Sequence, residues 1–145
     1  MSIGRPPARS DGVIPPKLAN FARLVNNVED KEILETAVRI AQDKKGEEIR
    51  ILDVSQNLGI TDFFLLVSAD NRRQAQAICA EIDTTMKRSG VPKAKIEGYQ
   101  EGWWILLDFD TVVIHIFQEE ARRFYDLDNL WGDSVERTKD FLGSP

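Results

Sequence analysis

The sequence of 145 residues is poor in the side chains that build metal centres and cross-links. It contains one cysteine, Cys79, and one histidine, His115. A single cysteine excludes an internal disulfide and a multi-cysteine zinc site, and a single histidine excludes the HExxH zinc motif. The phosphate-binding patterns GxxxxGK[ST] and GxGxxG and the nucleophile elbow GxSxG are also missing. The common enzyme motifs are therefore largely absent.

The chain also lacks long apolar runs and an excess of positive charge. No apolar run is long enough to span a bilayer, and the amino terminus has no signal-peptide core, so we expect a cytoplasmic protein without membrane contact. The formal net charge is −5. Gripping nucleic acid requires clustered Lys and Arg, whereas the pairs Arg72-Arg73 and Arg122-Arg123 are short and typical of solvated helix faces. We expect little direct nucleic-acid binding, and a basic protein is the more suitable partner.

The proline distribution suggests how the chain is organised. Residues 1–25 hold four of the six prolines and show little periodicity, which predicts a disordered leader. An organellar transit peptide is the less favoured interpretation of the same segment. Residues 26–133 are predicted to form a single α/β domain, and residues 134–145 a short C-terminal helix and tail. Asp133 and Glu136 have the spacing of a capping box for that helix.

Apolar periodicity predicts a mixed α/β order of elements. Helices are expected from near Asn27 to Gly46 and from Asn71 to Gly90, followed by a short helix over residues 118–126. Strands are expected over residues 48–54, within 59–69, over 94–98 and in a hairpin over 104–117. This order predicts a mixed sheet of about five strands packed with helices. Cys79 lies on the apolar stripe of its helix, which favours a core residue over a reactive thiol.

The hairpin would have two different faces. With a two-residue turn at Phe109-Asp110, Trp104 faces His115 and Asp108 faces Thr111. One face is wholly aliphatic and should pack on helices: Ile105, Leu107, Val112, Ile114 and Ile116. The other face is mixed: Trp104, Leu106, Asp108, Thr111, Val113, His115 and Phe117. A mixed face is either a second core layer or a docking surface. The residues alone favour the core layer, in which a buried histidine has its hydrogen-bond partner.

A carboxylate set offers a chemical alternative. Asp108 and Asp110 point the same way, and Asp53, Asp62 or Glu97 could supply a third carboxylate to hold two magnesium ions for nucleotidyl transfer. Acids at a hairpin turn are, however, also ordinary turn residues. No upstream Gly-Ser turn for a triphosphate precedes the pair. A magnesium-dependent nucleotidyltransferase is therefore the less favoured interpretation.

Three segments resemble one known family. "GITDFFLLVSA" at 59–69, "IEG" at 96–98 and "WILLDFDTVVIHIFQEEARRFYDLDNLWGD" at 104–133 resemble the Iojap family of ribosomal silencing factors. The resemblance covers roughly residues 28–133 and implies an α/β fold of nucleotidyltransferase-like topology, with no known enzyme activity and no cofactor. It implies binding to the large ribosomal subunit through large-subunit protein fourteen. The bound protein would block joining of the small subunit and lower protein synthesis during starvation. Organellar relatives imply large-subunit assembly as the alternative role.

The resemblance also changes the interpretation of the mixed face. It favours a docking surface, with no catalytic residue and with partner-binding residues Trp104, Leu106, Asp108, Phe109, His115, Tyr125 and Trp131. His115 would serve recognition or scaffolding. Alternatively, Tyr125, Leu127, Leu130 and Trp131 fold back over the edge of the sheet. An exposed apolar face could also pair with a second copy and form a homodimer. In one departure, relatives often have Gly-Asp where this chain has Asp110-Thr111, so the turn geometry is less certain.

Overall fold

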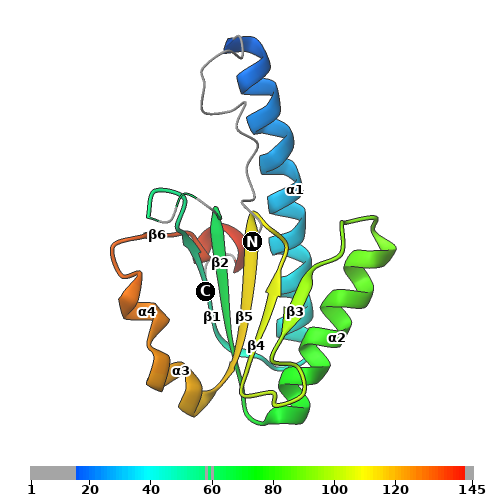
Figure 1. Cartoon of the computed structure of the whole chain (residues 1–145), viewed down its shortest axis with the longest axis vertical. Helices are drawn as coiled ribbons and strands as arrows, with labels where there is room; N and C mark the ends of the chain where they lie inside the picture. Colours follow the sequence, from blue (N-terminus) through cyan, green and yellow to red (C-terminus); the bar gives the residue numbers. More distant parts are fainter. Residues whose placement is uncertain (1–15, 58, 60, 143–145) are drawn as a thin grey trace.

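The computed structural model describes residues 16–57, 59 and 61–142, with side chains from residue 29 on. The described residues form a six-stranded sheet in the order β3-β4-β5-β2-β1-β6, with helices on both faces (Figure 1). The strands are β1 Glu47–Asp53, β2 Phe63–Ala69, β3 Lys95–Glu97, β4 Trp104–Asp108, β5 Val112–Gln118 and β6 Val135–Glu136. The helices are α1 Pro16–Asp43, α2 Arg72–Arg88, α3 Glu119–Tyr125, α4 Leu127–Leu130 and α5 Thr138–Leu142. This arrangement confirms the predicted mixed α/β fold.

Helix α1 begins earlier than the sequence predicts. It starts at Pro16 rather than near Asn27, so residues 16–25 are helical in the structure. Proline suits a first helical turn, because its missing N–H would have no partner there. The rest of the predicted leader, residues 1–15, lies outside the described residues. The division of the chain into leader, domain and tail stays a prediction.

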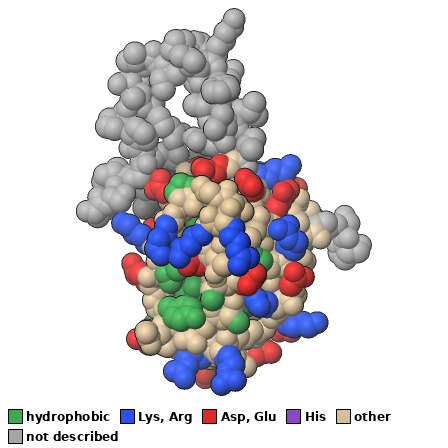
Figure 2. All heavy atoms as spheres, turned by 90° about the vertical axis from the view of Figure 1, so that its right-hand side faces the viewer, with side chains coloured by type: hydrophobic (Ala, Val, Ile, Leu, Met, Phe, Trp, Pro, Cys, Tyr) green, Lys and Arg blue, Asp and Glu red, His purple; other side chains and the backbone are tan. Residues whose placement is uncertain are grey.

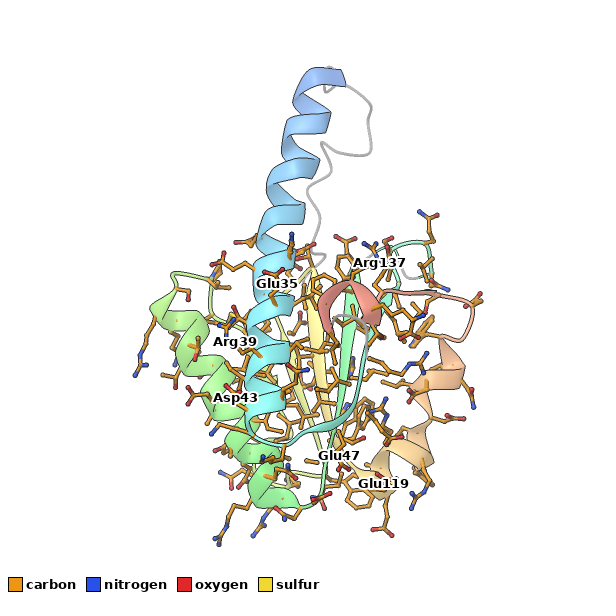
Figure 3. The ribbon with its side chains drawn as sticks, turned by 180° about the vertical axis from the view of Figure 1, so that it is seen from behind. Glu35, Arg39, Asp43, Glu47, Glu119 and Arg137 are labelled. Atoms are coloured by element: carbon orange, nitrogen blue, oxygen red, sulfur yellow. The ribbon has the colours of Figure 1, made fainter. Side chains whose placement is uncertain are left out.

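The aliphatic face of the sheet packs on α1, α2 and α5, as predicted. The five hairpin side chains assigned to this face are all fully buried there, at 0 % exposure: Ile105, Leu107, Val112, Ile114 and Ile116. Cys79 belongs to the same core, and burial raises the pKa of its thiol to about 12, with a smaller contribution from Asp83. The outer face of α1 carries Glu35, Arg39 and Asp43, on the side seen from behind in Figure 3. Spacing of four residues puts them on one solvated stripe.

The amino terminus of α2 is capped by the side chain of Asn71. The side chain of Asn71 accepts a hydrogen bond from the backbone N–H of Gln74 at 2.8 Å. The side chain of Gln74 accepts from the backbone N–H of Asp70 at 2.6 Å, one residue before the cap that a capping box would use. Gln74 also donates to the carbonyls of Lys44 and Lys45. The cap therefore ties α2 to the end of α1.

We expect Asn71→Ala to lower the free energy of unfolding by about 1 kcal/mol, because one backbone N–H loses its side-chain acceptor. Urea unfolding followed by circular dichroism measures this change. Thr84→Ala is the matched control, since Thr84 is exposed on the same helix. Equal midpoints for Asn71→Ala and the wild-type chain would contradict the capping role.

The parallel pair β2–β5 lies in the middle of the sheet, and the other pairs are antiparallel. The apolar run of β2 is unbroken and residues 64–69 are all buried, which is typical of a central strand covered on both faces. The sixth strand, β6, was not predicted. Glu136 pairs with Arg50 of β1 instead of capping a helix, and α5 begins only at Thr138. The predicted capping box of Asp133 and Glu136 is therefore wrong.

The hairpin turn lies one residue later than predicted. The backbone N–H of Phe109 donates to the carbonyl of Val112 at 2.8 Å, which leaves Asp110-Thr111 as the turn. Trp104 therefore pairs with Phe117, and Leu106 rather than Trp104 pairs with His115. The shift moves the partner of each residue by two positions, so each strand keeps its two faces. Asp110, the first residue of this turn, has φ 79°.

Candidate protein-docking surface

The mixed face of the sheet is covered over only part of its width. Helix α3 contacts β5 and β2, and α3 and α4 lie towards the β1 side in Figure 1, whereas none of the helices of the described residues is drawn in front of β3 and β4. A second core lies beneath the C-terminal segment and contains Leu52, Val54, Phe64, Leu66, Val113, Phe117, Ala121 and Leu127. Trp104 and Leu106 of β4 pack against its margin and remain partly exposed. One part of the mixed face is therefore a core layer under α3 and α4. The other part, along β4, is partly exposed to solvent.

His115 lies inside the second core rather than on the surface. It is 4 % exposed, and its ring packs edge-on against Phe64 at 4.6 Å and parallel to Phe117 at 5.9 Å between centroids. Its Nδ1 accepts a hydrogen bond from the indole Nε1–H of Trp104 at 3.0 Å. The second core covers the ring in this structure, so His115 has no exposed surface for direct recognition of a partner. Scaffolding is the role that the contacts support.

The environment of His115 keeps its ring neutral. Burial lowers the pKa of His115 to about 3. Because Nδ1 is an acceptor, the proton of the neutral ring is on Nε2, for which the described residues provide no hydrogen-bond partner. A proton added to Nδ1 would remove the acceptor of the Trp104 bond. Above about pH 4, the ring is therefore a fixed acceptor that orients the indole of Trp104.

Four aromatic rings lead from the second core to the surface. Phe117 stacks on Trp104 with centroids 5.3 Å apart, Trp104 contacts Tyr125 at 4.6 Å, and Tyr125 contacts Phe124 at 5.0 Å. Exposure rises outwards, from 1 % for Phe117 to 42 % for Tyr125 and 78 % for Phe124. We call the outer part the β4–α3 surface. It comprises Trp104, Leu106 and Asp108 of β4 with Phe124 and Tyr125 of α3.

Two other predicted contact residues lie elsewhere. Phe109 packs against the core on the helix side, because residues of odd number from Ile105 to Phe109 face that side. Phe109 was predicted at the hairpin turn as a partner-binding residue, and its packing in the structure is with the helix-side core. Trp131 is partly buried against the second core, with its ring 6.1 Å from Phe64. The tail therefore folds back over the sheet, as the alternative interpretation expected for Trp131, although Leu130 is 63 % exposed.

Charged side chains of both signs lie on and beside the β4–α3 surface, and exposed Lys95 of β3 pairs with Asp108 in the sheet. Asp108 lies on β4, and Glu119, Glu120 and Asp126 are exposed on and beside α3. Arg123 is the nearby cation of α3, and its charge is paired with Glu119 at 2.7 Å. Figure 2 shows a different side of the molecule, formed by α2 and β3, where Lys and Arg as well as Asp and Glu side chains lie around a small hydrophobic area. Exposed aromatic rings with the acidic side chains of α3 beside them suit a basic protein partner.

Sequence reasoning missed two residues of this region. Phe124 was not singled out, although burial of Ala121 and Arg122 on α3 turns Phe124 and Tyr125 outwards. Arg122 was predicted to be solvated, but it is 7 % exposed and bonds to Asp128 and Ser68. A charged residue in a basic pair has no sequence signal for burial. Its partners, on β2 and α4, come together only in the fold.

The carboxylates of the nucleotidyltransferase interpretation do not converge. Asp108 accepts a hydrogen bond from the backbone N–H of Asp110 at 2.7 Å, which is an ordinary role within a turn. Among the described residues, no group of three or more His, Cys, Asp or Glu side chains could hold a metal ion. The described part of the chain therefore does not assemble the three-carboxylate site.

The search for membrane spans among the described residues gave no candidate, because none of their helices is both long and apolar enough.

Comparison with known proteins decides the family. The sequence profile of "Ribosomal silencing factor during starvation" matches residues 27–144. The chain belongs to the ribosomal silencing factor family. It is 36 % identical to the ribosomal silencing factor of Bacillus subtilis over 111 residues, covering 77 % of this chain and 94 % of the relative. A crystal structure of a Chromobacterium violaceum protein has a TM-score of 0.67 and 32 % identity, covering 70 % of this chain and 84 % of that chain.

The chain is also similar to a protein whose name places it in an organelle. A mouse relative named "Mitochondrial assembly of ribosomal large subunit protein 1" is 27 % identical over 101 residues, which cover 68 % of this chain and 44 % of the mouse protein. The profile of the silencing factors spans the whole sheet and both cores, and it includes β6 and α5. The resemblance, which we placed on residues 28–133, therefore reaches almost to the carboxyl terminus. A ribosome-associated role in silencing or assembly follows from this membership.

Proposed function

We propose that this protein acts in the cytoplasm as a translational repressor that docks on the large ribosomal subunit and prevents the small subunit from joining. Large-subunit protein fourteen is the proposed contact, as the resemblance to the family implies. The mechanism is steric, so a bound protein occupies the place of the other subunit and requires no cofactor and no chemical step. Lower protein synthesis during starvation is the expected result.

The β4–α3 surface is the observation that supports this proposal. Large aromatic side chains next to a partly buried tryptophan supply contact area at a low cost in side-chain entropy, which is typical of binding hot spots. The acidic residues around them would meet the basic side chains of a ribosomal protein and steer its approach. Trp104, Leu106, Asp108 and Tyr125 remain proposed contacts from the sequence, and Phe124 joins them.

We expect purified protein to co-sediment with isolated large subunits and to lower the yield of joined ribosomes when small subunits are added afterwards. Sucrose gradients in the presence of magnesium measure both effects. Small subunits alone serve as the control and should not retain the protein. Retention on large subunits with an unchanged yield of joined ribosomes would contradict the steric mechanism while leaving the docking intact.

Large-subunit assembly is the second candidate function, and the name of the mouse relative favours it. Both functions would use the same docking surface. Cells lacking the protein should distinguish them. Excess joined ribosomes during starvation support repression, whereas accumulation of incomplete large subunits during growth supports assembly.

A further inference from the structure

We propose that Arg122 is the positioning residue of the β4–α3 surface: its buried guanidinium holds the turn between α3 and α4 on the sheet and thereby keeps Tyr125 against Trp104. The inference rests on the proposed function, because it concerns the same surface. It adds a residue that would never touch the partner and would act through Tyr125.

Arg122 connects the C-terminal segment to two strands. Its Nη1 donates to the carbonyl of Glu48 at 2.6 Å and to the hydroxyl of Ser68 at 2.9 Å, on β1 and β2. Its Nε and Nη2 donate to the two oxygens of Asp128 on α4, at 3.1 and 2.8 Å. The planar guanidinium can make these contacts together. The single ammonium of lysine cannot reproduce the bidentate hydrogen bonding to a carboxylate.

The β1 strand is locally distorted where it meets Arg122. The pairing of β1 with β2 shifts register between Glu47 and Arg50, and Glu48 has φ 48°. A residue other than glycine adopts such a conformation at a cost, which neighbouring contacts must offset. The carbonyl of Glu48 is the group that accepts the hydrogen bond from Arg122. The distortion of the strand thus supplies an acceptor for the buried cation.

The same residue fixes the turn between the two helices. Asp126 has φ 51° and ψ 46°, ends α3 and precedes α4, and its backbone N–H donates to the carbonyl of Arg122 at 2.9 Å. The side chain of Arg122 reaches across this turn to Asp128, which Arg50 also contacts at 2.7 Å. Burial alone would raise the pKa of Asp128, but the hydrogen bonds from Arg122 and Arg50 outweigh it and lower the pKa. Tyr125 immediately precedes this clamped turn.

Apolar contacts by themselves would hold α3 and α4 weakly. The two helices contain 7 and 4 residues, and their buried apolar side chains are Ala121 and Leu127. Helices this short do not persist without tertiary contacts. The Arg122 contacts are therefore the specific constraint on where Tyr125 lies. When they are lost, Tyr125 should leave Trp104 while the sheet remains folded.

The test is a double-mutant cycle between Arg122→Gln and Tyr125→Ala, read as affinity for large subunits. We expect each single variant to bind about tenfold more weakly, since Tyr125 is a proposed hot spot and Arg122 acts through it. The double variant should bind within about twofold of Tyr125→Ala alone. Once the Tyr125 ring is absent, loss of the Arg122 contacts has no ring left to displace. A full additional tenfold loss in the double variant would overturn the inference, since it would mean that Arg122 acts independently of Tyr125.

Two further variants control for charge and for folding. Arg123→Gln removes the neighbouring cation, which is exposed and paired with Glu119, and should leave the affinity unchanged. Arg122→Lys keeps the charge but loses the planar fork, so it should not restore full affinity. Full rescue by lysine would show that charge alone matters and would overturn the positioning role. Should Arg122→Gln fail to fold, Asp128→Asn weakens the same clamp and takes its place in the cycle.

A second measurement does not depend on the ribosome. In the wild-type chain, nuclear Overhauser contacts between the rings of Tyr125 and Trp104 should be present, and Arg122→Gln should lose them while the amides of β2 and β5 stay protected from exchange. Persistence of these contacts in Arg122→Gln would overturn the inference. If the wild-type chain does not bind large subunits, the proposed function fails, and the ring contacts still decide the role of Arg122.

Discussion

Trp104→Ala should weaken binding to isolated large subunits by about 2 kcal/mol or more, which is roughly 30-fold in affinity. The indole lies in the middle of the β4–α3 surface, with Phe117 behind it at 5.3 Å and Tyr125 beside it at 4.6 Å. Its truncation removes the largest ring of the surface and leaves the neighbouring rings without their shared contact. Co-sedimentation over a range of protein concentrations measures the change.

Two variants make this result interpretable. Trp103→Ala removes the preceding tryptophan, which is 38 % exposed and lies before β4, and should change the affinity by about 0.5 kcal/mol or less. Trp104→Phe keeps an aromatic ring but loses the N–H that donates to His115. It should lose part of the affinity, because the ring remains while its orientation is less fixed. A folded Trp104→Ala variant that co-sediments like the wild-type chain would remove Trp104 from the proposed interface.

The free energy of unfolding should fall by about 2 kcal/mol between pH 7.5 and pH 5.0 because of His115 alone. Burial lowers the pKa of this residue in the folded chain to about 3, whereas the unfolded chain titrates near the ordinary value of 6.5. Between these two values, the unfolded state binds a proton that the folded state does not. The contribution of neutral His115 to the free energy of unfolding is therefore complete above about pH 6.5, and it is lost as the pH falls towards 3.

Urea titrations at a series of pH values measure this dependence. His115→Phe keeps a flat ring among Phe64 and Phe117 but cannot be protonated, so its stability should change much less over the same range. The ordinary pKa values of carboxyl groups lie near 4, and Asp128 and Glu136 are shifted lower still, so these two groups contribute mainly below pH 5. Parallel curves for the two proteins would show that His115 takes up a proton in the folded state as readily as in the unfolded one.

The hairpin shows how far local pattern carries a prediction. Alternation along residues 104–117 predicted an aliphatic face and a mixed face, and the aliphatic side chains are buried under the helices. The turn was predicted one residue too early, at Phe109-Asp110. A two-residue turn at either position keeps the same side chains on each face of the hairpin, so the alternation of apolar residues does not distinguish the two positions. Positive φ at Asp110 selects the later position, and an aspartate gives a weaker signal for it than a glycine would.

The site was predicted less completely than the fold. Trp104, Leu106, Asp108 and Tyr125 lie together on the β4–α3 surface, whereas Phe109 faces the helices and His115 is covered. For Phe109, the alternation of the strand already indicated the helix side. For His115, the alternation fixed only the face of the sheet. Whether that face is exposed depends on α3 and α4, which follow β5 along the chain and fold back over it.

By itself, the sequence determined the α/β class, the two faces of the hairpin, the buried stripes of α1 and α2, and the resemblance to the silencing factors. These properties follow from periodicity and short motifs, which act between residues near in the chain. The tertiary structure alone decided that His115 is buried, that Val135–Glu136 forms a sixth strand, and that Arg122 is a buried clamp. Each depends on partners distant in sequence: Arg122 meets Glu48, and Glu136 meets Arg50. Only the closed fold brings such groups within hydrogen-bonding distance.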